Sequence, residues 1–260
     1  MLKIRIIPTL LWKGPGLVKG VGFNGWRRVG SVLPAIKVYD KREVDELIIV
    51  DINATAEKSP PDAASIHEFA QNLSVPLTVG GGITDNRQII KLLEAGADKI
   101  ALNTSAFDNP GLIADAARYF GTQCVVVSID ARRLEDGSYR CFTRCGTEAT
   151  GLSPVSFARI AADLGAGEIL ITSIERDGTM QGYDLDLIAS VAEAVDVPVI
   201  ASGGAGNYQH MIDAVVQGGA GAVAAASIFH FTEQTPSKAK DAMGRAGIPV
   251  RIGLRDRVEA

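Results

Sequence analysis

The segment Val75-Pro76-Leu77-Thr78-Val79-Gly80-Gly81-Gly82 returns 122 residues later as Val197-Pro198-Val199-Ile200-Ala201-Ser202-Gly203-Gly204. Each copy is a short apolar run that ends in glycines, which is typical of a buried strand followed by a tight turn. The same offset matches Ser105 to Ser227. Self-similarity at a fixed offset predicts a chain made of two similar halves.

Short apolar runs alternate with helix-like segments along the whole chain. The runs lack polar alternation, as expected of parallel strands covered on both faces. Capping side chains predict helix starts at Asp62, Ser153 and Asp184. Eight strand–helix pairs in 260 residues predict one (β/α)8 barrel, a TIM barrel, with half-barrels at about 1–122 and 123–250. The expected strands are Ile4–Leu10, Glu46–Ile52, Leu77–Val79, Lys99–Leu102, Cys124–Asp130, Ile169–Ile174, Pro198–Ala201 and Ala222–Ala225.

Composition excludes several classes of protein. The chain has 26 Lys and Arg against 30 Asp and Glu, a net charge of −4, which argues against nucleic acid as the main partner. It has no apolar run of about 18 residues and no signal-peptide core at its start, so we expect no membrane association and a cytoplasmic location. Its three cysteines form neither a disulfide framework nor a metal-ligand pattern, and we expect no metal or other cofactor.

Two glycine turns are candidate phosphate sites. Glycines between a strand and a helix let backbone N–H groups approach an anion. The alternative is that these glycines only make the turns tight. Two such turns at related positions favour a ligand with a phosphate at each end. The candidate phosphate-binding residues are Gly81, Gly82, Asn103, Thr104, Asp177, Gly178, Gly203, Gly204, Ala226 and Ser227.

One acid is a candidate catalyst. Asp130 closes the apolar fifth strand, where burial would raise its pKa and suit it to acid–base chemistry, unless it only caps a neighbouring loop. Asp51 and Asp177 also follow strands and either contact a ligand or shape loops. Alignment of the first strand with the fifth puts Leu11 at the position of Asp130, so a two-carboxylate mechanism would lack one acid. The Asp136-Gly137 pair predicts a small hairpin after the fifth strand.

Four charged residues begin strands of the barrel, and their side chains should converge at its amino-terminal end. Two bases and two acids there can form a closed ring of ion pairs. Such a ring either stabilises the barrel bottom or gates a passage through it. The residues are Arg5, Glu46, Lys99 and Glu168.

Several motifs resemble the cyclase subunit of imidazole glycerol phosphate synthase over nearly the whole chain. Among them are Asp45–Leu47, Thr78–Ile83, Arg176–Thr179 and Ser202–Gly206. The resemblance implies a duplicated (β/α)8 fold and a phosphoribulosyl-formimino-aminoimidazole carboxamide ribotide substrate with two phosphates. It also implies a glutaminase subunit docked at the barrel bottom near Asp98. Ammonia from that subunit would enter through the ring of four charged residues, which favours the gate over a stabilising plug.

The chain departs from that family at a catalytic position. The family's two catalytic carboxylates correspond to Leu11 and Asp130, so the first is missing. Losing one general acid or base typically costs about two to four orders of magnitude in rate. Leu11 and the extra residue in Gln217–Gly221 both resemble a paralogous branch associated with amidation of sugar nucleotides for surface polysaccharides.

Three functions follow as hypotheses. In the first, the barrel conducts ammonia from a glutaminase and works with a separate sugar amidotransferase. In the second, it is an authentic cyclase of histidine biosynthesis that makes imidazole glycerol phosphate and aminoimidazole carboxamide ribotide, with Asp130 moving most of the protons. In the third, it only binds a phosphosugar and regulates a partner, a role that needs no gate. We favour the first, and whether the chain keeps catalytic activity of its own stays open.

Overall fold

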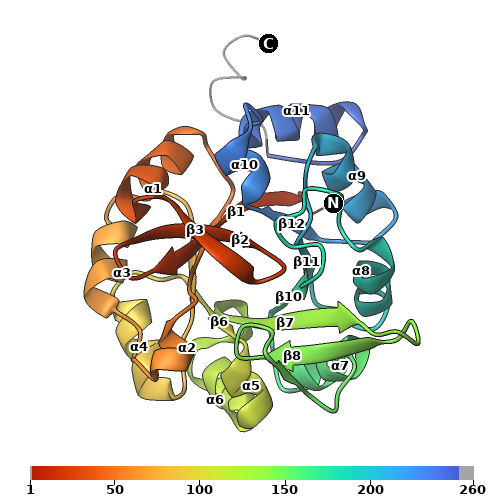
Figure 1. Cartoon of the computed structure of the whole chain (residues 1–260). Coiled ribbons are helices and arrows are strands. Elements are labelled where there is room, and N and C mark those ends of the chain that lie inside the picture. Colours follow the sequence, from red (N-terminus) through yellow and green to blue (C-terminus); the bar gives the residue numbers. More distant parts are fainter. Residues whose placement is uncertain (1, 252–260) are drawn as a thin grey trace.

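A computed structural model describes residues 2–251 and shows a ring of strands surrounded by helices (Figure 1). Within these residues, eight parallel strands lie in the order β10–β11–β12–β1–β4–β5–β6–β7, and pairing of β7 with β10 closes the ring. The fold is a (β/α)8 barrel, as predicted. The barrel strands are β1 (Arg5–Lys13), β4 (Leu47–Asp51), β5 (Leu77–Gly80), β6 (Lys99–Leu102), β7 (Val125–Arg133), β10 (Glu168–Ser173), β11 (Val199–Ser202) and β12 (Ala222–Ala225).

Helices follow the strands in turn and cover the outside of the barrel (Figure 1). The side chains of Asp62, Ser153 and Asp184 each accept a hydrogen bond from a backbone N–H three residues later, which confirms the predicted helix starts. None of the helices described is both long and apolar enough to span a bilayer. They are α1 (Val32–Lys41), α2 (Ala54–Glu57), α3 (Ala63–Ala70), α4 (Asn86–Glu94), α5 (Thr104–Asp108), α6 (Gly111–Phe120), α7 (Pro154–Asp163), α8 (Leu185–Ala192), α9 (Tyr208–Val216), α10 (Ser227–Phe231), α11 (Pro236–Arg245) and the 3-10 turn η1 (Thr122–Cys124).

The period of two along each strand sorts the apolar side chains into two clusters. On β1, Ile6 and Leu10 belong to the large cluster between strands and helices, whereas Ile7 belongs to a smaller one inside the barrel. Branched and small side chains fill the barrel's middle, so it is a packed core rather than an open pore. The inner cluster is Ile7, Ile48, Ala101, Val126, Leu170, Ile200, Ala222 and Ala224.

Within residues 2–251, two hairpins extend from the barrel. The hairpin predicted at Asp136-Gly137 is present: β7 pairs antiparallel with β8 (Tyr139–Thr143), which pairs with β9 (Glu148–Ala149). A hairpin of β2 (Gly16–Val21) and β3 (Asn24–Gly30) after β1 was not predicted. Both β1 and β7 run three residues beyond their predicted ends, because antiparallel pairing with β2 and β8 continues the ladder.

One backbone contact near the start of β10 is tight enough to test. Gly167 donates its N–H to the Val125 carbonyl oxygen at 2.9 Å, and a Cβ added to it would collide with the Thr122 carbonyl oxygen. Gly151, before α7, has nothing within 4 Å of the same position.

Gly167→Ala is therefore expected to lower the free energy of unfolding by about 1–3 kcal/mol, because the backbone must move to relieve the collision. Gly151→Ala should leave it unchanged or raise it by up to about 1 kcal/mol, because alanine restricts the unfolded chain. Urea unfolding of both variants measures the difference. Equal midpoints would contradict the close approach of Gly167 to η1.

Candidate functional site

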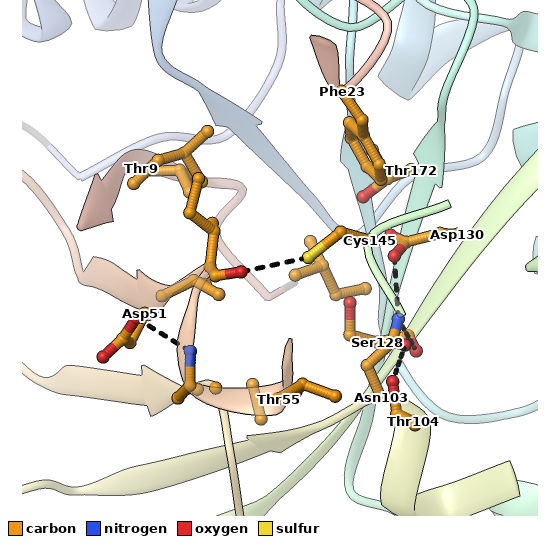
Figure 2. Close-up of a pocket in the computed structure, with 18 of the residues that line it drawn as sticks. Thr9, Phe23, Asp51, Thr55, Asn103, Thr104, Ser128, Asp130, Cys145 and Thr172 are labelled. Atoms are coloured by element: carbon orange, nitrogen blue, oxygen red, sulfur yellow. Dashed lines mark hydrogen bonds between the residues drawn. The ribbon is translucent and has the colours of Figure 1, made fainter. Parts of the chain in front are cut away.

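A cavity of about 590 Å³ lies at the carboxyl ends of the barrel strands. Active sites of β/α barrels lie at this face, and the volume is within the range of small-molecule sites. All ten residues predicted to bind phosphate line the cavity, as do Leu11 and Asp130. Figure 2 shows Asp130 and Asn103 on one side of this space, with Asp51 across from them. The strand order thus gathers residues from both halves of the chain around one cavity.

Asp130 is the buried acid of the cavity. It lies on β7 with 9% of its surface exposed, and its Oδ2 accepts a hydrogen bond from Asn103 Nδ2 at 2.9 Å (Figure 2). Burial raises the pKa of Asp130 to about 7; the Asn103 hydrogen bond opposes this shift and the Asp177 carboxylate adds to it. A carboxyl group that titrates near neutral pH can both donate and accept a proton, which suits it to general acid–base catalysis.

The position expected for a second acid holds an aliphatic side chain. Leu11 lies on β1, partly exposed to the cavity, and pairs with Val50 on β4. The nearby Asp51 is engaged by its own loop, because its Oδ1 accepts hydrogen bonds from the backbone N–H groups of Asn53 and Ala54 at 2.9 and 3.2 Å. Asp51 therefore fixes the turn before α2, which is one of the two roles considered for it.

The glycine turns are required by packing between neighbouring loops. Gly81 has a φ of 105°, and a Cβ there would collide with the Asp51 carbonyl oxygen. Gly204 has a φ of 107°, and a Cβ there would collide with the Gly182 carbonyl oxygen. Tight turns alone explain these two glycines, so phosphate binding at the turns stays a prediction.

The unpredicted hairpin contributes a buried cation to the cavity. Lys19 on β2 is 3% exposed and lines the cavity with Phe23 and Trp26. Burial lowers the pKa of Lys19 to about 8, opposed by the Asp177 carboxylate. Burial also raises the pKa of Asp177, opposed in turn by Lys19. The Gly22 N–H donates to the Asp177 carbonyl oxygen at 2.9 Å, which holds the hairpin against the loop after β10.

At the opposite end of the barrel, the four predicted charges form a closed ring. Arg5 pairs with Glu46 at 2.7 Å and with Glu168 at 2.8 Å. Lys99 pairs with Glu46 at 2.9 Å and with Glu168 at 3.1 Å. Glu46, 1% exposed, also accepts a hydrogen bond from the Thr78 hydroxyl at 2.7 Å. Each charge thus has an opposite charge on both sides.

Asp98 lies beside this ring at the start of β6 and is exposed. Its Oδ2 accepts a hydrogen bond from the Leu77 N–H at 2.8 Å, and its own N–H donates to the Leu77 carbonyl oxygen at 2.9 Å. Asp98 therefore joins the starts of two neighbouring strands, and its proximity to a partner stays a prediction.

A closed (β/α)8 barrel with a cavity at the carboxyl ends of its strands is the architecture of barrel enzymes that act on small molecules. A family model described as histidine biosynthesis protein matches residues 5–235. The chain belongs to this family. The match supports the resemblance to the cyclase subunit over nearly the whole chain.

Glu46→Gln tests the charge ring. It leaves Arg5 and Lys99 to share one carboxylate, and breaking a buried ion pair costs about 3–5 kcal/mol. Because the Arg5 and Lys99 side chains are 24% and 16% exposed, we expect a loss of about 2–3 kcal/mol in the free energy of unfolding. Asp115→Asn, which breaks an exposed pair with Arg118, should cost no more than about 0.5 kcal/mol. Similar losses in urea unfolding would contradict a buried ring.

Asp130→Asn tests the raised pKa. Between about pH 4 and pH 7 the folded chain holds a proton on Asp130 that the unfolded chain has lost, so this group lowers the free energy of unfolding as pH rises. Asparagine does not titrate, so the free energy of unfolding of the variant relative to the parent should grow over that window and level off above about pH 8. The two pKa values limit the gain to about 4 kcal/mol. Urea unfolding of both proteins from pH 5 to pH 8 measures it; a constant difference would contradict the shift.

Proposed function

We propose that this chain is the barrel subunit of a glutamine-dependent synthase, and that ammonia from a glutaminase enters at the charge ring and leaves at the cavity. The order of side chains inside the barrel supports this. On β1, the ring residue Arg5 is followed by the apolar Ile7 and then by the cavity residue Thr9. The same order recurs along β6 and the residue that follows it, as Lys99, Ala101 and Asn103. From the bottom of the barrel to its mouth, the interior thus consists of the charge ring, then the apolar inner cluster, then the cavity.

The apolar middle suits neutral ammonia. Moving an ion into such packing carries a large desolvation cost, whereas a small uncharged molecule avoids most of it. The layer therefore favours ammonia over ammonium and over other ions. Because the ring is closed and the middle is packed, each passage needs side chains to move, and Lys99 is a suitable gate residue since a lysine stem has many rotatable bonds.

A hydroxyl group at the cavity floor has free hydrogen-bonding capacity. The Oγ1 atom of Thr9 is buried and has no hydrogen-bond partner within residues 2–251. A buried hydroxyl without a partner is costly, and a small polar molecule can satisfy it. Thr9 therefore supports a role as the first polar contact for ammonia that leaves the apolar layer.

The observation that carries the proposal is a complete charge ring combined with Leu11. A cyclase needs two proton-transfer groups at the cavity, and leucine supplies none. Ammonia conduction needs the ring and the apolar layer but no second acid. We therefore infer that the ammonia is used by a separate enzyme, which amidates a nucleotide-linked sugar in surface-polysaccharide biosynthesis. The glutaminase that supplies the ammonia would dock near Asp98 at the ring.

A cyclase of histidine biosynthesis is the second candidate, and the hairpin residue Lys19 favours it. This amine lines the same cavity as Asp130, and its pKa of about 8 lies close to the pKa of about 7 of that acid. Two buried groups that titrate near neutral pH can act as an acid–base pair. On this alternative, the predicted phosphate sites hold the two ends of the ribotide substrate.

The test is turnover of the formimino ribotide with an ammonium salt, which removes the glutaminase from the question. We expect no measurable turnover by the unmodified chain. Leu11→Asp should gain about two to four orders of magnitude over that background, because it restores the missing proton-transfer group. Turnover of the unmodified chain within about tenfold of the variant would overturn the ammonia-delivery proposal in favour of the cyclase.

A further inference from the structure

A second groove, of about 430 Å³, lies beside the β2–β3 hairpin. Two of its lining residues are cations and one is a tryptophan, and none of its lining residues, all in the described part of the chain, is acidic. The volume is within the range of small-molecule sites. The groove is lined by Lys13, Gly14, Pro15, Gly16, Val18, Trp26, Arg28 and Asn53.

A glycine brings the two cations together. Gly16 pairs with Lys13 across the β1–β2 ladder, so their side-chain positions are on the same face. Arg28 lies across Gly16, since its Nε is 2.6 Å from the place where a Cβ of Gly16 would be. Its Nη2 donates to the Pro15 carbonyl oxygen at 3.5 Å. Lys13 and Arg28 therefore lie on the same face beside one glycine, where an anion between the two side chains would offset the repulsion of their like charges.

A second glycine seats the tryptophan. Cε3 of Trp26 lies 3.0 Å from the place where a Cβ of Gly20 would be, so the indole packs over bare backbone. Trp26 precedes Arg28 by two residues on β3, which puts both side chains on one face of the hairpin. Trp26 also lines the main cavity and thus forms a wall shared by the groove and the barrel mouth.

We propose that this groove binds the nucleoside diphosphate part of a nucleotide-linked molecule. The two cations match the charge of a diphosphate, and guanidinium and ammonium groups are the usual protein partners of phosphate oxygens. The indole ring offers a face on which a base stacks. Asn53 adds a polar side chain at the far wall.

The groove lies next to the barrel mouth, and this position connects nucleotide binding to the proposed function. Because Trp26 lines both the groove and the main cavity, a nucleotide held there would keep its attached group beside the mouth from which ammonia passes to the separate amidating enzyme. This step rests on the proposed function; binding in the groove does not.

One carboxylate lies at the edge of the groove, and its removal is expected to increase the affinity for an anion. Asn53 Nδ2 donates to the exposed Glu57 Oε1 at 2.8 Å, so a negative charge lies next to a groove residue. Glu57→Gln should tighten nucleotide binding by about two- to threefold, because it removes this repulsion.

The experiment is isothermal titration of the full chain at low salt with uridine diphosphate, uridine and inorganic pyrophosphate. We expect saturable binding of uridine diphosphate at least about tenfold tighter than of either fragment. The double variant Lys13→Gln/Arg28→Gln should lose at least about tenfold in affinity. Trp26→Leu should reduce the affinity to that of pyrophosphate. Arg118→Gln, which removes an exposed arginine stacked on Tyr119 of α6, is the matched control and should change nothing.

Two results would overturn the proposal. One is the absence of saturable heat with uridine diphosphate at millimolar concentration. The other is binding that persists unchanged in Lys13→Gln/Arg28→Gln, which would place the nucleotide in the main cavity. A disturbed hairpin can only weaken binding, so the tighter binding expected for Glu57→Gln distinguishes a true electrostatic effect from a loss of structure. If the formimino ribotide assay overturns the ammonia-delivery proposal, nucleotide binding in the groove is unaffected, so the two proposals can fail separately.

Discussion

Closure of the parallel sheet by the β7–β10 hydrogen bonds is the constraint on which the rest of the molecule depends. Once the ring is closed, every second side chain on each strand points inward and has no route to bulk water except through the two ends. Charged residues at the strand starts must then satisfy one another, and Glu46 does so with Arg5, Lys99 and Thr78. Closure brings these side chains together, and the alternation of signs lets each of the four charges pair with two opposite ones.

The two ends of the barrel handle charge in opposite ways. At the bottom, each acid pairs with two bases, and the ring is internally neutral. At the mouth, Asp130 and Lys19 are buried and Asp177 is partly buried, and loss of contact with water shifts the pKa of each of them toward neutrality. Shifted pKa values of this kind are typical of sites that bind or transform ligands. The mouth is therefore the candidate site of chemistry, whereas the charges at the bottom neutralise one another.

Most of the fold could be predicted because the barrel strands are local apolar runs, two of which lead into glycine turns, at Gly80–Gly82 and Gly203–Gly204. The ring was predictable because its members all start strands. The β2–β3 hairpin was not, since Gly16–Gly30 mixes glycine and basic residues without a clean alternation. Its position over the mouth depends on a contact between Gly22 and Asp177, which are far apart in sequence. Lys19 and the groove at Arg28 depend on that placement and were missed with it.

In this barrel, the glycine turns maintain the backbone frame of the mouth, whereas the side chains that line the cavity determine its chemistry. Gly81 and Gly204 pack so closely against neighbouring backbone that neither position has room for a side chain. The backbone around the mouth therefore tolerates few substitutions at these turns. The side chain of Leu11, by contrast, lines the cavity and makes no hydrogen bond with that frame. A barrel of this kind can exchange one reaction for another by drift at a strand end, while the scaffold around it stays fixed. Divergence of activity would then run ahead of divergence of shape.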